Sequence, residues 1–195
     1  MPSVAVIPVK SFSLGKQRLA GALTRQQRAA LGKAMVEHVS SAVVDAGLLP
    51  VLVTADPEVA TWAAGQAIPS IPDPGEGLNT AAREGVRWAG RSRSSWMILH
   101  SDLPLLTSRE LKIFIEHANE TDAIAPSADG GTSAIAANHE IEFAFGPSSF
   151  SRHLPRLRNA SVVALTGLLH DVDAPADLHA ARHHPRGQWI ERALR

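Results

Sequence analysis

The sequence contains no cysteine, which excludes disulfide bonds, thiolate nucleophiles and metal sites built on cysteine. Its apolar runs are all far shorter than the ~18 residues that a membrane-spanning helix needs. The segment Met1–Val9 has neither a basic start nor a long apolar stretch, so we do not expect it to act as a secretory signal. These absences lead us to expect a soluble cytoplasmic protein without a membrane partner.

The chain also lacks a surplus of charge, because its 19 basic residues are balanced by 19 acidic ones. A neutral protein has no overall attraction to nucleic acid or to anionic membranes. We therefore expect no nucleic-acid partner, and any site for a polyanion must be local. With 195 residues, of which 45% are hydrophobic, the chain is expected to form one domain that spans residues 1–195.

The order of the expected strands and helices predicts an α/β fold. The first half alternates strands with helices, which indicates a parallel sheet covered on both faces. The denser strands after residue 123 predict that the sheet becomes mixed. The expected strands are Val4–Val9, Val51–Thr54, Ile68–Ile71, Trp96–His100, Ala123–Pro126, Thr132–Ala137 and Ser161–Leu165. The expected helices are 24–46, Pro57–Ala64, Asn79–Arg91, 107–118, Phe150–Arg158 and Pro175–Ala181, and two of them start with the capping boxes Thr24/Gln27 and Thr107/Glu110.

The loop after the first expected strand is basic, although both common phosphate-binding signatures, GxxxxGK[ST] and GxGxxG, are absent from the sequence. Lys10, Lys16 and Arg18 lie within nine residues and surround Gly15. A glycine loop at the carboxyl end of a strand can turn backbone N–H groups toward a phosphate, and basic side chains can neutralise its charge. The alternative is an ordinary basic surface loop.

Carboxylates follow two of the extended segments. Asp102 comes directly after a strongly hydrophobic strand, and Asp171 and Asp173 are spaced so that they share one face of an extended chain. Carboxylate oxygens suit Mg²⁺, which commonly bridges to substrate phosphates. The alternatives are that Asp102 closes a turn and that Asp173 caps the next helix, while Asp177 is expected to be a solvated helix residue.

Three further segments carry small or polar side chains. Gly130–Ser133 and Phe145–Phe150 offer backbone N–H groups and hydroxyls to an anion, although ordinary turns would have the same composition. In Leu78-Asn79-Thr80, the amide of Asn79 has both a donor and an acceptor, as base recognition requires. The alternative for Asn79 and Thr80 is a helix cap.

Taken in order, these motifs resemble the CofC/FbiD family of guanylyltransferases of coenzyme F420 biosynthesis, which belong to the MobA-like nucleotidyltransferases. The motifs are Pro8-Val9-Lys10, Gly15-Lys16-Gln17-Arg18-Leu19, Leu78-Asn79-Thr80-Ala81, Ser101-Asp102-Leu103-Pro104, Gly130-Gly131-Thr132, Gly146-Pro147-Ser148-Ser149 and Asp171-Val172-Asp173-Ala174-Pro175-Ala176-Asp177-Leu178. The resemblance implies a single three-layer α/β/α sandwich, Rossmann-like, with a mixed and mostly parallel sheet of the nucleotide-diphospho-sugar transferase type.

The resemblance also implies roles for particular residues. Lys10, Lys16 and Arg18 would hold the GTP phosphates, and Leu78, Asn79 and Thr80 would help to read guanine. Asp102, Asp171 and Asp173 would ligate Mg²⁺, and Thr132, Gly146 and Ser149 would bind a phospho-acid. Lys16, Arg18 and Asp102 would be catalytic, whereas His100, His153 and His170 are expected to be structural. Gln17, Ser101 and Ser133 stand where the family usually has Ser or Thr, Gly, and Asn or Ala, respectively.

The implied reaction joins GMP from GTP to the phosphate of 2-phospho-L-lactate, phosphoenolpyruvate or 3-phospho-D-glycerate and releases pyrophosphate. The product would pass to the downstream transferase of coenzyme F420 biosynthesis, and the enzyme would be able to form a homodimer. One alternative is another MobA-like enzyme, such as a molybdenum cofactor guanylyltransferase, although the LAGG-type start of that family is missing. The other alternative is a nucleotide-binding protein without catalytic activity.

Overall fold

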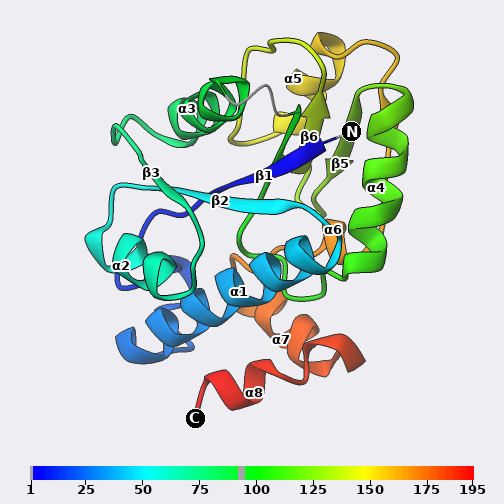
Figure 1. Cartoon of the computed structure of the whole chain (residues 1–195). Helices are drawn as coiled ribbons and strands as arrows, with labels where there is room; N and C mark the ends of the chain where they lie inside the picture. Colours follow the sequence, from blue (N-terminus) through cyan, green and yellow to red (C-terminus); the bar gives the residue numbers. More distant parts are fainter. Residues whose placement is uncertain (1, 92–94) are drawn as a thin grey trace.

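The computed structural model describes residues 2–91 and 95–195, which form a seven-stranded sheet in the order β3-β2-β1-β4-β6-β5-β7 (Figure 1). The strands are β1 (Pro2–Pro8), β2 (Leu49–Thr54), β3 (Ser70–Pro72), β4 (Ser95–Leu99), β5 (Ala123–Pro126), β6 (Thr132–Ala137) and β7 (Ser161–Val162). β6 runs antiparallel to both of its neighbours, and the other pairs are parallel. The predicted mixed and mostly parallel sheet is therefore confirmed.

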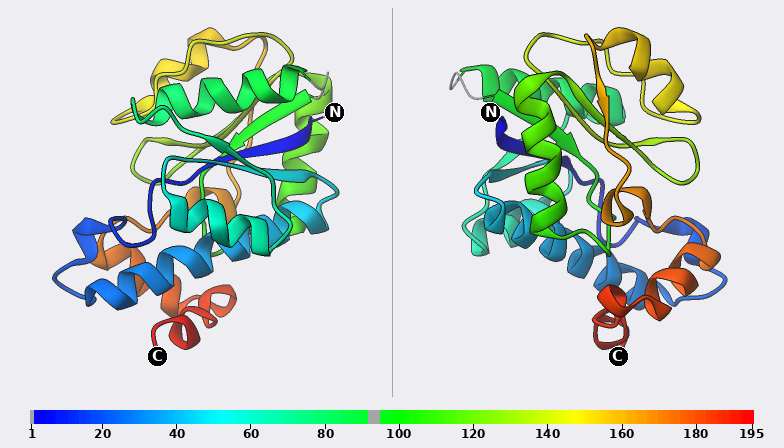
Figure 2. Two further views of the ribbon diagram at one scale, coloured as in Figure 1. Left: turned by 60° about the vertical axis from the view of Figure 1, so that its left-hand side comes forward. Right: turned by 90° about the vertical axis from the view of Figure 1, so that its right-hand side faces the viewer.

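Helices cover both faces of this sheet. They are α1 (Arg25–Asp45), α2 (Pro57–Gly65), α3 (Leu78–Arg91), α4 (Ser108–Glu120), α5 (Ser149–His153), α6 (Thr166–Leu169), α7 (Pro175–His183) and α8 (Ile190–Ala193), with short 3-10 turns at Gln17–Leu19, Leu154–Arg156 and Pro185–Gly187. Figure 2 shows α3 and α5 on one side of the sheet and α1, α2 and α4 on the other. None of the helices in the described ranges is long and apolar enough to cross a membrane.

Alternation along β1 explains why each face of the sheet has its own hydrophobic core. Ala5 and Ile7 pack in the cluster beneath α1, α2 and α4, whereas Val4 and Val6 pack in the cluster beneath α3. Successive side chains of a strand point to opposite faces, so an uninterrupted apolar strand needs a helical layer on each side. The expected three-layer sandwich is confirmed.

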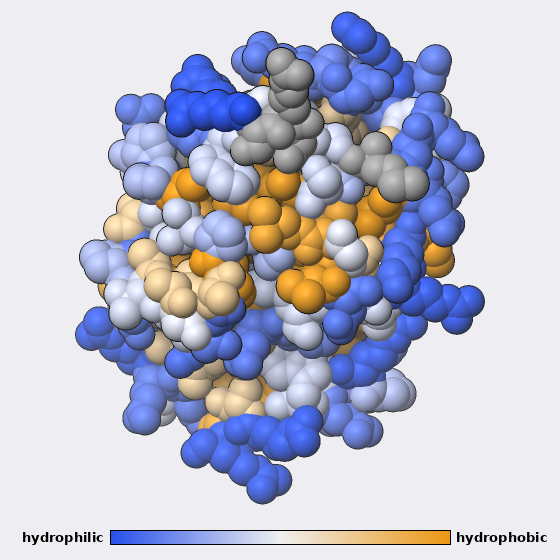
Figure 3. Space-filling model, viewed as in Figure 1, coloured by the Kyte–Doolittle hydropathy of each residue, from blue (hydrophilic) through white to orange (hydrophobic). Residues whose placement is uncertain are grey.

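The outer surface is mainly hydrophilic but not uniformly so. In Figure 3, hydrophilic residues form a rim around a central area where apolar residues gather. Val44 at the end of α1 and Leu49 at the start of β2 are 57% and 43% exposed. Single exposed apolar side chains of this kind are normal on a folded domain.

The ends of the long helices follow the predicted signals. Both capping boxes are present, at Thr24/Gln27 and at Thr107/Glu110. Gly47 follows α1 with a φ of 86°, a left-handed conformation that glycine adopts without the steric cost of a Cβ atom. Short polar signals therefore mark where α1 and α4 begin, and glycine marks where α1 ends.

Three of the expected elements differ from the structure. The strand expected at Ser161–Leu165 is only β7, because the chain turns directly into α6, which we did not predict. The third strand begins two residues later and ends one residue later than expected, at Ser70–Pro72. The helix expected at Phe150–Arg158 is divided into α5 and a 3-10 turn that contains Pro155. Pro155 has no N–H group to donate to the carbonyl of Ser151, so the α-helical hydrogen bonding does not continue there.

Glu110 fastens the unpredicted α6 and the C-terminal segment to α4. Its carboxylate accepts the backbone N–H of Gly167 at 2.9 Å, the guanidinium of Arg186 at 2.9 Å and the hydroxyl of Thr107 at 2.7 Å. Burial opposes ionisation, but these hydrogen bonds outweigh it and lower the pKa of Glu110. One buried carboxylate thus joins segments that are far apart in the sequence.

Gly167 leaves no room for a larger residue against this carboxylate. A Cβ atom at this position would meet Glu110 and lie 2.7 Å from the Cα of Leu106. We expect Gly167→Ala to lower the free energy of unfolding by about 1–3 kcal/mol, the usual cost of overpacking. In α1, a Cβ atom on Gly32 would meet nothing within 4 Å. Gly32→Ala should therefore raise stability by up to about 1 kcal/mol. Urea unfolding of both variants checks this, and equal effects at the two glycines would contradict it.

Candidate active site

Three segments meet at the carboxyl edge of the sheet. The loop after β1 brings Lys16, the turn after β4 brings Asp102, and the segment between α6 and α7 brings Asp173. A backbone hydrogen bond of 3.1 Å from Val172 N–H to the carbonyl of Asp102 holds the last two segments together. Ligands of open α/β sheets bind at this edge, so the expected location of the site is supported by the fold.

The centre of this cluster is the ammonium group of Lys16. Its Nζ lies 2.5 Å from Oδ2 of Asp102 and 3.1 Å from Oδ1 of Asp173. The side chains of Lys16 and Asp102 are only 13% and 18% exposed, whereas that of Asp173 is 47% exposed. Burial alone would lower the pKa of Lys16, but the two carboxylates outweigh it and raise this pKa. Burial likewise opposes ionisation of Asp102, but the ammonium lowers its pKa, so both groups are charged at neutral pH.

The backbone of the β1 loop is shaped to present Lys16. Lys16 has a φ of 53° and a ψ of 39°, the left-handed region that non-glycine residues rarely occupy. A Cβ atom on the preceding Gly15 would lie 2.6 Å from the carbonyl oxygen of Ser11, so the loop requires glycine there. The carbonyl of Lys16 accepts the N–H of Leu19, whose side chain is fully buried. Strained backbone held in this way is typical of functional loops.

Asp171 adds a third carboxyl group near Asp102, and this group holds its proton more tightly than usual. Burial, followed by the nearby charges of Asp102 and Asp129, raises its pKa to about 7. Oδ1 of Asp102 and Nε2 of His100 are buried without a hydrogen-bond partner among the described residues. The cluster therefore has more acceptor capacity than its one ammonium satisfies.

These residues have the chemistry of a magnesium site. Carboxylate oxygens are the preferred ligands of Mg²⁺, and the unpartnered oxygen of Asp102 marks a position that a cation would satisfy. Within residues 2–91 and 95–195, no three carboxylate or imidazole groups already stand close enough together to hold a metal ion. The ammonium of Lys16 lies between Asp102 and Asp173, the position that a shared cation would need.

The start of α7 corrects two of our interpretations. Asp173 does not cap this helix, because the cap position is Ala174. Asp177 is not merely solvated, because its Oδ2 accepts the backbone N–H groups of Asp173 and Ala174 at 3.1 and 2.7 Å. The side chain at the third helical position closes the first turn, which leaves the carboxylate of Asp173 free to contact Lys16.

The structure separates the three basic residues that the sequence grouped together. Lys16 is drawn inward to the carboxylates, while Lys10 and Arg18 are exposed at the two ends of the loop. Exposed basic side chains on this loop can reach a phosphate without breaking an ion pair. Their role in holding the triphosphate stays a prediction.

The proposed guanine-reading residues lie at the start of α3. Oδ1 of Asn79 accepts the backbone N–H of Phe145 at 2.6 Å, and the hydroxyl of Thr80 accepts a hydrogen bond from Arg83 at 3.1 Å. Asn79 therefore joins α3 to the loop 138–148 rather than capping its own helix. Leu78 is half-buried beside it, and base recognition by these residues stays a prediction.

The proposed acceptor residues also come together, but beneath the surface. Thr132 is fully buried, and the hydroxyl of Ser149 donates to its Oγ1 at 3.3 Å. The N–H of Ser149 donates to the carbonyl of Gly146, which has a φ of 123° and is exposed. Sequence reasoning missed that His153 joins them, with its Nδ1 3.0 Å from the same Thr132 oxygen. Burial, followed by the charges of Arg156 and Arg152, lowers the pKa of His153 to about 4, so the ring is neutral at ordinary pH.

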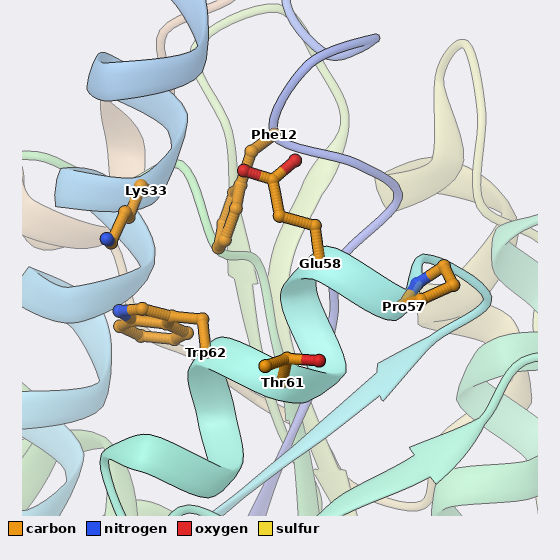
Figure 4. Close-up of a pocket in the computed structure, with 6 residues that line it drawn as sticks. All are labelled: Phe12, Lys33, Pro57, Glu58, Thr61 and Trp62. Carbon is orange, nitrogen blue, oxygen red and sulfur yellow. The ribbon is translucent and has the colours of Figure 1, made fainter.

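A separate groove lies on the other side of the β1 loop. It has a volume of about 480 Å³ and lies between α1, α2 and Phe12 (Figure 4). The ring of Phe12 packs edge-on against Trp62 at 5.7 Å, and Lys33 and Glu58 stand at its borders. Asp102, Asp171 and Asp173 do not line this groove, so it is separate from the charged cluster around Lys16.

The raised pKa of Asp171 predicts how stability depends on pH. In the unfolded chain this carboxyl would titrate near pH ~3.9. Between this value and about 7, the folded protein holds a proton that the unfolded chain has released, so the free energy of unfolding falls as pH rises. We expect Asp171→Asn to flatten this fall and to raise the melting temperature above pH ~7, with little gain near pH ~4. Thermal melting without added metal checks this, with the exposed Glu116→Gln as control. Parallel pH profiles for the Asp171→Asn variant and the unaltered protein would contradict it.

Comparison with known proteins shows which family this chain resembles. Residues 3–190 match the family described as guanylyl transferase CofC like. A phosphoenolpyruvate guanylyltransferase of Sphaerobacter thermophilus is 36% identical over 199 aligned positions, which cover 96% of each chain. A 2-phospho-L-lactate guanylyltransferase of Methanothermobacter thermautotrophicus is 29% identical and covers 100% of this chain and 91% of its own. The alternatives of a molybdenum cofactor enzyme and of a protein without catalytic activity are not favoured by these relatives.

Solved structures with the same fold are more distant in sequence. One from Desulfovibrio desulfuricans G20, assigned to the nucleotide-diphospho-sugar transferases, has a TM-score of 0.76 at 15% identity and covers 100% of this chain and 97% of its own. A nucleotidyl transferase of a Methanothermobacter species has a TM-score of 0.63 at 18% identity, with 97% of each chain covered. These likenesses confirm the predicted fold type, and the match over residues 3–190 together with the relative at 36% identity shows that the chain belongs to the CofC-like guanylyltransferase family.

Proposed function

We propose that this protein is a Mg²⁺-dependent enzyme that joins GMP from GTP to the phosphate of a three-carbon phospho-acid and releases pyrophosphate. The observation that carries this proposal is the cluster of Lys16, Asp102 and Asp173 at the carboxyl edge of the sheet, in which Lys16 and Asp102 are largely buried. The names of its relatives support phosphoenolpyruvate or 2-phospho-L-lactate as the acceptor, and the resemblance to enzymes of coenzyme F420 biosynthesis supports a downstream transferase as the consumer of the product.

The proposed reaction needs charge neutralisation more than it needs a base. A phosphate oxygen of the acceptor attacks the α-phosphorus of GTP, and pyrophosphate leaves on the opposite side. Because the attacking phosphate is already an anion, it needs no base to activate it. The main obstacle is to bring several anions together, which positioning and fixed positive charge overcome. Asp102, Asp171 and Asp173 would hold Mg²⁺, which supplies Lewis-acid stabilisation and orients the phosphates when it is bound.

Lys16 has two successive partners in this proposal. In the structure its ammonium neutralises Asp102 and Asp173. A divalent cation on the same carboxylates would repel the ammonium, and the four-carbon stem of lysine lets the group turn toward a phosphate. The two exposed basic residues of the loop, Lys10 and Arg18, would neutralise the rest of the triphosphate.

Pyrophosphate release is the direct test of this function. We expect release to require GTP, Mg²⁺ and one of phosphoenolpyruvate, 2-phospho-L-lactate or 3-phospho-D-glycerate. The variant Asp102→Asn keeps the volume of the side chain but weakens cation binding, so it should lose at least about a hundredfold in kcat/KM, or ~2.7 kcal/mol. Its circular dichroism spectrum should be unchanged. Release that is indifferent to the phospho-acid, or near-normal turnover of the variant at limiting Mg²⁺, would contradict the proposal.

Replacing Lys16 by methionine should strengthen metal binding and weaken the use of GTP. Lys16→Met removes the ammonium that occupies the carboxylates, so Mn²⁺ should bind the nucleotide-free protein about tenfold more tightly, or ~1.4 kcal/mol. The same variant should need far more GTP for turnover, because the triphosphate loses a cationic contact. Titration of Mn²⁺ by electron paramagnetic resonance measures the first effect and steady-state kinetics the second.

Lys112→Met is a matched control for this experiment, since Lys112 is exposed on α4 outside the cluster. It should change neither quantity. If Lys16→Met weakened Mn²⁺ binding, Lys16 would support the metal site instead of competing with the cation.

A further inference from the structure

A buried chain of hydrogen bonds leads to the turn that carries Gly146. Its members are Thr132 at the start of β6 and Ser149 and His153 on α5, which are 0%, 2% and 0% exposed. Nδ1 of His153 lies 3.0 Å from Oγ1 of Thr132, and Nε2 lies 2.8 Å from the backbone nitrogen of Ala144. The hydroxyl of Ser149 donates to the same Thr132 oxygen at 3.3 Å.

The contacts of His153 determine where its proton lies. A backbone N–H group can only donate, so Nε2 must accept from Ala144 through its lone pair. In a neutral imidazole the proton then sits on Nδ1, which donates it to Oγ1 of Thr132. This oxygen accepts from both His153 and Ser149, so the hydroxyl proton of Thr132 is directed away from both of them. The lowered pKa of His153 agrees with a ring that stays neutral at ordinary pH.

The same imidazole also holds the loop above it. The ring of Phe145 packs on His153 in a T-shaped contact, with 4.7 Å between centroids, and Ala144 is tied to Nε2. The backbone N–H of Phe145 donates a hydrogen bond to Oδ1 of Asn79 in α3. Two adjacent residues before Gly146 are therefore held in place. His153, beside the proposed acceptor residues, holds Ala144, and Asn79, one of the proposed guanine-reading residues, holds Phe145.

From these contacts we propose that His153 is a positioning residue for the phospho-acid: by donating from Nδ1 and accepting at Nε2, it orients the Thr132 hydroxyl and holds the Gly146 turn ready to receive the anion. This inference rests on the proposed function. His153 does not contact the reacting atoms in this proposal and acts only through Thr132 and the Gly146 turn. Donors that are held in place before binding do not lose conformational freedom when the ligand arrives, so the affinity for the acceptor depends on this ring.

Substitutions of His153 can separate its two hydrogen bonds. In His153→Asn the amide N–H falls near Nδ1 and can still donate to Thr132, whereas in His153→Gln the amide oxygen falls near Nε2 and can still accept from Ala144. His153→Phe keeps an aromatic ring against Phe145 and loses both bonds. His179→Phe on α7 makes the same replacement at an exposed histidine outside both proposed sites and should change nothing.

The kinetic test compares the KM of the acceptor with the KM of GTP. We expect His153→Phe and His153→Gln to raise the acceptor KM about tenfold and His153→Asn to raise it less, because only Asn preserves the bond that orients Thr132. The KM of GTP should stay within about twofold in all three variants. Equal increases in both constants, or no increase in either, would overturn the inference and leave His153 a core residue.

A second measurement does not depend on activity or on a substituted protein. Nitrogen-15 NMR of the histidines in the unaltered chain should show His153 neutral, with its proton on Nδ1, between pH ~5 and ~8. The tautomer with the proton on Nε2, or a protonated ring in this range, would overturn the proposal. If the unaltered protein released no pyrophosphate with any phospho-acid, the proposed function would fail instead, while the NMR result would still report on the hydrogen-bond chain.

Discussion

The ion pairs of Lys16 with Asp102 and Asp173 are the contacts on which the rest of the site depends. Two ionised carboxylates from different loops repel each other, so both can stay charged at this edge of the sheet only with a positive charge between them. The left-handed backbone at Lys16, the close approach of Gly15 to Ser11 and the use of Asp177 as the helix-closing side chain all serve this arrangement. Each leaves a charged group free to reach the cluster instead of being used in local structure.

The polar groups of the site fall into a charged part and a neutral part. Around Asp102 the contacts are between ions, and a surplus of carboxylate remains at Asp171. Around Thr132 the partners are hydroxyls, backbone N–H groups and an imidazole held neutral by burial. A cation is attracted to the carboxylates of the first part, whereas the hydroxyls and backbone N–H groups of the second part are the kind of donor that suits an anion. This separation suits a reaction that must hold a metal ion and an anionic acceptor next to each other.

Sequence patterns were sufficient for the layers of the fold because these depend on local signals. Alternating apolar strands and two capping boxes specify where β1, α1 and α4 begin and which faces they bury. They were not sufficient for α6, whose start depends on Glu110, fifty-seven positions away from its partner Gly167. The site shows the same division. Lys16, Asp102 and Asp173 meet at one edge of the sheet, as the sequence predicts, but the partner of Asn79, the two hydrogen bonds of His153 and the inward position of Lys16 arise from contacts between distant segments. Only packing determines such contacts.

The reversed direction of β6 has a geometric consequence for a reaction with two substrates. In an entirely parallel sheet, the active edge would collect only residues that follow strands. Because β6 runs against β4, its first residue lies at the edge where β4 ends, and the backbone N–H of His100 bonds to the carbonyl of Ser133 at 2.9 Å. Asp102 thus follows one strand and Thr132 begins the next, with about 5 Å between neighbouring strands. A single inverted strand places the charged and neutral parts of the site side by side without any loop having to cross the sheet.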